Sequence, residues 1–422
     1  MGVISLKIAF RRSLLAAAVL AFAASPIAAQ VAPAQTEAPT RVASEDERLM
    51  ALFQDDQRRE DALDPISQVY RGGDANPRVL RMVYTDELTR ARRAAVAQSL
   101  AALTAIDRRK LSAERQISYD VFLTTKRREA MWLRPDMDAL TAVRPFTHFG
   151  GLNVEFASLM AKGGPLNYAT EADYRENLEL LHAFPQVMDN AARQFRRGMD
   201  TGVVETRMTT RNMIGQIDAL LDQPLDQSPF MSPVAEFPVG VPEDRRAALR
   251  AEWQTAVTGE VLRASRRFRA FLADESLPAA REVAGISAMK GGATVYRQLI
   301  GEHTTLPLSA EAVHRLGLSE VARIQREMDG VRRELGYPQG TLRQFFDTMR
   351  SDPRFHPTKA EELSQGFEAT GRAVDVQVPR FFSTVPKTRL LIEPYPAYRE
   401  KYEAGGSYNQ GSPDATRPGT FY

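Results

Sequence analysis

The chain has 422 residues, of which 43% are hydrophobic, so it is long enough for one large domain or two ordinary ones with a sizeable core. Its 55 basic and 53 acidic side chains leave a formal net charge of +2, without the basic excess expected of a nucleic-acid-binding protein. It contains no cysteine, which excludes a thiolate nucleophile, a cysteine-ligated metal and a lipid-modified amino-terminal cysteine.

Residues 1–29 have the pattern of a secretory signal peptide. A positively charged start precedes a short apolar segment rich in Ala and Leu, and small residues precede Gln30. The apolar segment is shorter than the roughly 20 residues that a membrane span needs. The pattern predicts an exported protein, periplasmic or secreted. Residues 30–43, rich in Ala, Pro and Gln, are expected to form a disordered leader.

Helical signals dominate residues 44–222, which we interpret as an N-terminal helical subdomain. Ser44 opens a helix through a capping box, and Thr85 is placed to cap the next long helix. The many Gly and Pro residues between 144 and 165 predict a loop. Pro185 is expected to begin a new helix, because a proline is tolerated in the first turn but interrupts a helix interior.

Five prolines between residues 223 and 242 predict an extended crossing, which we take as the boundary to a second subdomain, residues 243–422. Beyond the crossing, residues 243–273 and 309–336 have helical patterns, the latter with apolar positions three and four apart. Only the last forty or so residues carry much β signal, including residues 416–422. The predicted fold class is therefore mainly α: a long-helix scaffold with a few short β-strands near the C-terminus.

No catalytic motif stands out. The five histidines form no H-E-x-x-H pair, and no serine lies in a G-x-S-x-G turn. From motifs alone we assign no catalytic residue and no metal ligand. His303 follows an apparent helix containing Tyr296 and is expected to lie in a loop, where polar residues are often functional. A packed, hydrogen-bonded histidine is the alternative interpretation.

Two segments carry the most specific pattern in the chain. One spans residues 285–318 and includes Gly291-Gly292, Tyr296 and His303; the other is Arg417-Pro418-Gly419-Thr420-Phe421-Tyr422. With weaker similarity over residues 173–203, these segments resemble the secreted bacterial proteins of the domain of unknown function 885 family. The resemblance covers nearly all of the chain after the signal segment.

The resemblance implies a function, because that family in turn resembles gluzincin metallopeptidases. It implies a metallopeptidase-like cleft, a peptide substrate, and zinc as the cofactor of a full-length member. The family's zinc motif would lie beyond the equivalent of Tyr422, so the resemblance implies a chain truncated before its metal ligands and inactive as written. By analogy, residues 416–422 would be an edge strand that pairs with the substrate backbone. Tyr296, His303 and Tyr422 are then the candidate substrate-binding residues.

A second hypothesis comes from a different class: a complete, non-catalytic periplasmic helical protein that binds or interacts with a partner. An H-E-x-x-H-like segment encoded after Tyr422 would favour the first hypothesis, and a stop codon with a stable zinc-free product would favour the second. Both predict no nucleic-acid partner and no membrane contact beyond the signal segment. Peptide specificity and oligomeric state do not follow from either.

Overall fold

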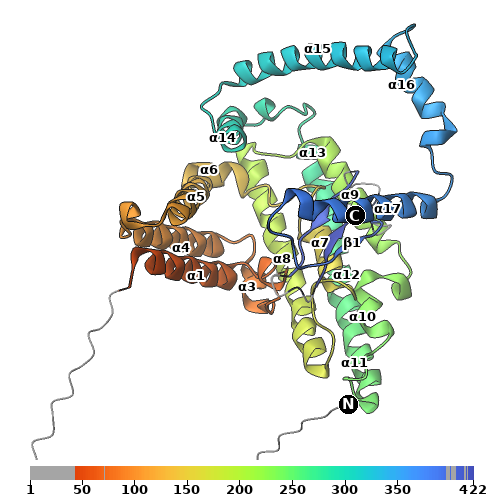
Figure 1. The fold of residues 1–422 in the computed structure, drawn as a ribbon. Helices are drawn as coiled ribbons and strands as arrows, with labels where there is room; N and C mark the ends of the chain where they lie inside the picture. The colour runs from red at the N-terminus through yellow and green to blue at the C-terminus, as the bar shows by residue number, and fades with distance from the viewer. Residues whose placement is uncertain (1–42, 71, 396–399, 401–404, 413–414, 416) are drawn as a thin grey trace, which may run out of the picture. The chain divides into compact units, whose positions relative to one another are not determined.

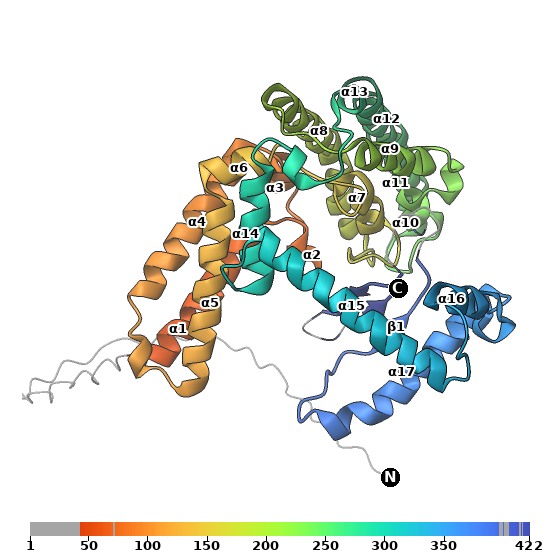
Figure 2. The ribbon, with the colours of Figure 1, turned by 90° about the horizontal axis from the view of Figure 1, so that it is seen from above.

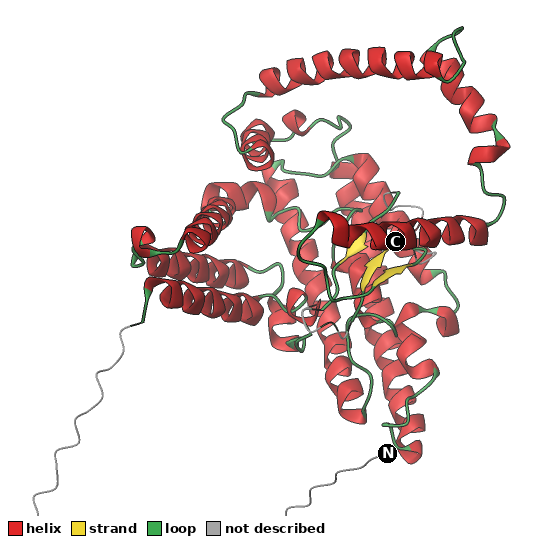
Figure 3. Cartoon of the chain, viewed as in Figure 1, coloured by secondary structure: helices red, strands yellow, loops and turns green. Residues whose placement is uncertain are grey.

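The computed structural model describes residues 43–422, except for 71, 396–399, 401–404, 413, 414 and 416. The predicted signal peptide and nearly all of the predicted leader lie outside the described residues. Helices make up most of the described chain, and a small sheet lies near the C-terminus (Figure 3). The predicted fold class is confirmed. None of the described helices is long and apolar enough to cross a membrane.

Three helices near the N-terminus pack along one another as a bundle (Figure 2). Their apolar stripes meet around the buried side chains of Leu49, Leu103 and Leu111. The predicted caps at Ser44 and Thr85 are confirmed, since each side chain accepts a hydrogen bond from the first turn of its helix. The bundle and its connections comprise α1 (Glu45–Leu63), α2 (Ser67–Tyr70), α3 (Pro77–Met82), α4 (Asp86–Thr104), the 3₁₀ turn η1 (Arg108–Lys110), α5 (Ala113–Trp132) and α6 (Pro135–Thr141).

The main core surrounds one long helix, α8 (Glu171–Thr201), which packs against α3, α7, α11 and α12 (Figure 1). The prediction that Pro185 begins a new helix was wrong: it lies inside α8. A proline removes one backbone hydrogen bond, but buried side chains on both sides of it, such as Phe184 and Val187, hold the helix against the core. Gly202 ends the helix in a left-handed conformation at φ 78°.

The segment from 144 to 165 also differs from the predicted loop, because it contains the helix α7 (Leu152–Met160). Almost every side chain of α7 is buried, so tertiary packing rather than local sequence stabilises it. Gly151 precedes it at φ 147°, and a Cβ there would lie 2.1 Å from the Cβ of Phe146. Only glycine therefore allows this tight entry into the helix.

The proline-rich segment after residue 222 crosses the core as short helical turns rather than as an extended strand. Phe230, Met231 and Val234 are buried there, so the crossing packs on the core. The crossing contains η2 (Leu225–Gln227), η3 (Pro229–Met231) and α10 (Ser232–Ala235). It follows α9 (Arg207–Leu221) and precedes α11 (Glu243–Ala256), α12 (Leu262–Phe271) and α13 (Leu277–Ala279), with π-helical turns η4 (Val257–Val261) and η5 (Leu272–Ser276).

Long helices continue toward the C-terminus. They are η6 (Ile286–Ala288), α14 (Gly292–Thr304), α15 (Ala310–Glu334), α16 (Leu342–Ser351), η7 (Pro353–Phe355) and α17 (Ala360–Phe381). Ser309 caps α15, because its side chain accepts a hydrogen bond from the N–H of Ala312. The apolar stripe predicted on α15 is present but exposed: Val321, Ile324, Met328 and Val331 are each between 38% and 52% accessible.

The exposure of this stripe predicts that α15 tolerates charge. We expect Ile324→Lys, at a side chain that is 43% accessible, to change the free energy of unfolding by no more than about 0.5 kcal/mol, as is usual for surface positions. Urea unfolding followed by circular dichroism measures it. As a contrast, Ile217→Lys would place an ammonium in the core at a side chain that is 1% accessible, and should abolish cooperative folding. A large loss for Ile324→Lys would contradict the exposed position of the stripe.

The sheet has three strands in the order β1–β3–β2: β1 (Leu390–Ile392), β2 (Tyr408–Asn409) and β3 (Gly419–Phe421). β3 runs parallel to β1 and antiparallel to β2. Helix α17 packs over this sheet, with the rings of Phe367 and Phe421 6.0 Å apart. The guanidinium of Arg417 donates a 2.6 Å hydrogen bond to the carbonyl of Tyr70, which ties the sheet to α2.

Candidate functional site

Two of the predicted substrate-binding residues, Tyr296 and His303, share one face of α14. They are seven residues apart, so the helix geometry places them two turns and about 10 Å apart along the axis. Both side chains are exposed, Tyr296 to 40%. The prediction that His303 lies in a loop was wrong, because it belongs to the last turn of α14. Val295 and Ile300 lie on the buried side of the helix.

Contacts with the N-terminal bundle hold α14 in place. The indole Nε1 of Trp132 donates a 2.6 Å hydrogen bond to Glu302, and the guanidinium of Arg128 lies 3.6 Å from the same carboxylate. On the buried side, Val295 packs in a cluster with Met137. These contacts fix the orientation of α14, and Tyr296 and His303 remain on an exposed face of the helix.

The third predicted residue, Tyr422, follows β3 and stacks on Tyr395, with ring centroids 5.5 Å apart. Its backbone exchanges two hydrogen bonds with Ser407. The strand predicted within residues 416–422 exists, but the expectation that it is a free edge strand was wrong. β3 is the central strand and its backbone is paired on both sides, so it cannot add another strand.

Among the strands that the structure describes, β1 is paired on one side only, by β3. The carbonyl of Arg389 accepts from Gly419, and the N–H of Glu393 donates to Phe421, so these alternate residues face β3. In a parallel ladder alternate residues face opposite sides, so Leu390 and Ile392 direct their N–H and carbonyl groups away from β3. Among the strands that the structure describes, none lies on that side of β1.

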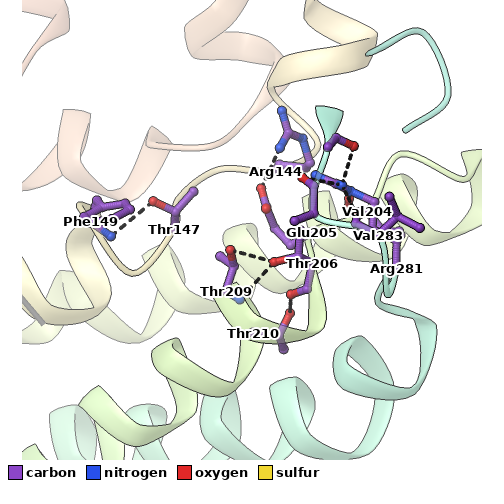
Figure 4. Close-up of polar contacts among 12 residues, drawn as sticks. Arg144, Thr147, Phe149, Val204, Glu205, Thr206, Thr209, Thr210, Arg281 and Val283 are labelled. Carbon is purple, nitrogen blue, oxygen red and sulfur yellow. Dashed lines mark hydrogen bonds and ion pairs between the residues drawn. The ribbon is translucent and has the colours of Figure 1, made fainter. Parts of the chain in front are cut away.

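A buried polar cluster lies where the segment after α6, the start of α9 and the end of α13 meet, and sequence reasoning missed it (Figure 4). The guanidinium of Arg144 pairs with the carboxylate of Glu205 at 2.7 Å, with both side chains largely buried. Arg281 donates hydrogen bonds to the carbonyls of Val204 and of three residues from Val283 onward. Burial lowers the pKa of Arg281, and Glu205 opposes that effect. No local sequence pattern signals this cluster, because its residues come from three separate segments.

His148 lies beside this cluster, buried in the segment that leads into α7. Burial lowers the pKa of its imidazole, and Glu205 acts in the opposite direction. The amide of Gln216 holds the backbone carbonyl of His148 at 2.8 Å. A buried neutral imidazole can accept or donate a hydrogen bond, but among the described residues no group of three or more His, Asp and Glu side chains could hold a metal ion.

The fold and these sites define a mainly helical protein with a small C-terminal sheet. Within that class, the chain belongs to the family described as "Bacterial protein of unknown function (DUF885)", whose model matches residues 65–422. No curated protein matches the chain.

Two solved structures have a similar fold. One is a "putative lipoprotein" from Colwellia psychrerythraea, with a TM-score of 0.74 and 18% identity over 90% of this chain and 67% of that one. The other is a "putative lipoprotein of unknown function" from Shewanella oneidensis, with a TM-score of 0.53 and 15% identity over 90% of this chain. The chain spans about two thirds of the length of each, 67% and 64% respectively.

Proposed function

We propose that this chain is the peptide-binding part of an exported, metallopeptidase-like protein, and that an extended peptide pairs with the outer edge of β1. Export is supported by the signal pattern of residues 1–29 and by the description of two structural neighbours as a "putative lipoprotein". Among the described residues, no group of three or more His, Asp and Glu side chains could hold a metal ion. The proposal therefore assigns peptide binding to this chain, and zinc-dependent hydrolysis to a longer protein that supplies the metal ligands.

The observation that carries the proposal is the order of the sheet. β3 is paired on both sides, whereas the backbone groups of Leu390 and Ile392 point away from it. A strand edge of this kind binds an extended peptide through main-chain hydrogen bonds, and side chains beside it choose among sequences. The side chain of Leu390 is exposed and would contact the side chains of such a peptide.

Leu390→Pro tests the proposal because it removes an N–H that points outward and leaves the ladder to β3 intact. We expect the variant to bind a fluorescein-labelled, end-blocked hexapeptide of alternating threonine and valine about tenfold more weakly, the equivalent of one lost hydrogen bond. Fluorescence anisotropy with the full chain measures the affinity. Leu390→Ala is the matched control: it shortens the side chain but keeps the N–H, and should change affinity by less than about threefold.

A second arm uses the peptide instead of the protein. The same hexapeptide, N-methylated at alternate residues, cannot donate to the edge and should lose its binding. Equal binding of both peptides, or equal binding by Leu390→Pro and the parent chain, would show that main-chain pairing at β1 is not the binding mode.

A further inference from the structure

A cavity of about 300 Å³ lies between the N-terminal bundle and α8, away from the sheet. Its volume is at the small end of the range for ligand pockets. Residues from α4, α5, α6, the segment after α6 and α8 meet around it. The polar and aromatic side chains that line it include Arg92, Trp132, Asp138, Thr141, Arg144 and Gln194.

The acidic side of the cavity is Asp138. Its carboxylate makes no hydrogen bond or ion pair with any residue that the structure describes. Arg93 and Arg197 are near enough to act on it, but Arg93 donates to the carbonyl of Leu133 at 2.8 Å and Arg197 donates to Asp86 at 2.7 Å. Burial raises the pKa of Asp138. A partly buried carboxylate without a partner is stabilised by a ligand that supplies an ammonium group.

The basic side of the cavity is formed by Arg92 and Arg144. Arg144 uses one terminal nitrogen for Glu205, and its buried Nε has no hydrogen-bond partner in the described chain. Trp132 also lines the cavity, and its ring is held in place by its hydrogen bond to Glu302. Guanidinium groups favour carboxylates, because they offer several N–H donors in one plane.

We propose that this cavity binds a small zwitterion, a free amino acid or a dipeptide with both ends unblocked. Its ammonium group would bind Asp138, its carboxylate would bind Arg92 and Arg144, and its side chain would lie against Trp132. The proposal does not rest on peptide pairing with β1. A peptide blocked at both ends can still pair with the sheet edge, but it lacks both charges that this cavity selects.

Tryptophan fluorescence gives a local readout of binding, because the chain has only two tryptophans. Trp253 is fully buried and donates to the carbonyl of Phe230, so the emission of Trp132 is the one that a ligand changes. Titration of the full chain with L-alanyl-L-alanine should change the emission saturably, with isothermal calorimetry as the independent measurement. Trp132→Phe should remove the optical change.

Asp138→Asn separates the proposal from its alternatives. The change keeps the shape of the side chain and breaks no hydrogen bond or ion pair among the described residues. It should weaken the binding of alanyl-alanine about tenfold, the equivalent of one charge-assisted hydrogen bond. Asp136→Asn is the matched control, since that carboxylate is exposed and paired with Arg134, and it should bind as the parent chain does. Acetyl-alanyl-alanine should bind the parent chain as weakly as alanyl-alanine binds Asp138→Asn.

Three results would overturn the proposal. They are equal affinity for the acetylated and free dipeptides, unchanged affinity in Asp138→Asn, and no heat or emission change with alanyl-alanine up to about 10 mM, a concentration that would reveal even very weak ligands. Failure of these tests leaves the peptide titrations at β1 unaffected, so the two proposals stand or fall separately.

Discussion

Replacing Glu205 by alanine is expected to lower the free energy of unfolding by about 3–5 kcal/mol, the range for breaking a buried ion pair. Glu205 is 6% accessible, and its partner Arg144 has a side chain that is 16% accessible. Glu205 also opposes the effect of burial on the pKa of Arg281. Without the carboxylate, two guanidinium groups lose their nearest compensating charge. Urea unfolding at neutral pH, followed by circular dichroism, measures the loss.

Two controls separate burial from charge pairing. Glu275→Ala removes a carboxylate of similar geometry, 2.6 Å from Arg196, but both partners are more than 40% exposed, so we expect a loss of no more than about 1 kcal/mol. Replacing both members of the buried pair, Arg144→Met with Glu205→Leu, should recover much of the loss because no unpaired charge remains. A cost for Glu205→Ala no larger than that of Glu275→Ala would contradict the burial of this pair.

Lys126→Met is expected to destabilise the N-terminal bundle by about 3 kcal/mol, because it leaves a buried carboxylate unpaired. The side chain of Lys126 is 3% accessible, and its ammonium lies 2.9 Å from Asp56, which is also buried. Glu60 and Glu129 complete the cluster but are each more than 40% exposed, so most of the cost falls on Asp56. Urea unfolding measures it. Lys110→Met, at an exposed lysine in the same bundle, is the control and should cost little.

The stabilisation by Lys126 should weaken as the pH becomes alkaline. Burial acts to lower the pKa of Lys126, but hydrogen bonds with Glu60, Asp56 and Glu129 outweigh it and raise the pKa above its ordinary value of 10.5. The unfolded chain therefore releases this proton first as pH rises. The difference in unfolding free energy between the parent chain and Lys126→Met should be constant below about pH 10 and shrink above it. A difference that stays constant to about pH 12 would contradict the raised pKa.

The caps at Ser44 and Thr85 could be predicted because capping depends on one side chain and the next three residues. The apolar stripe of α15 could also be predicted, from the helical spacing of its apolar residues. The continuation of α8 through Pro185 and the existence of α7 could not be predicted, because packing against the core outweighs a proline and two glycines. Local sequence contains no measure of that packing energy.

The residues of the candidate site could likewise be predicted from the sequence only in part. Residues Tyr296 and His303 could be named from a family pattern, and their shared face follows from the period of a helix. The central position of β3 could not be predicted, because a strand's neighbours in a sheet are chosen by long-range pairing between residues that are distant in sequence. The same holds for the Arg144 and Glu205 pair and for the cavity around Asp138, whose members come from separate helices.

The sequence by itself therefore determined the helical class of this protein, where several of its helices begin, and its family. These properties follow from side-chain periodicity, capping and local motifs, which act over a few residues. The tertiary structure alone decided which strand is central in the sheet, which charges are buried together, and that Asp138, Arg92 and Arg144 line one cavity. These properties depend on packing between distant segments. Burial removes water from polar groups, so each buried polar group costs free energy unless it has a hydrogen-bond partner or an opposite charge.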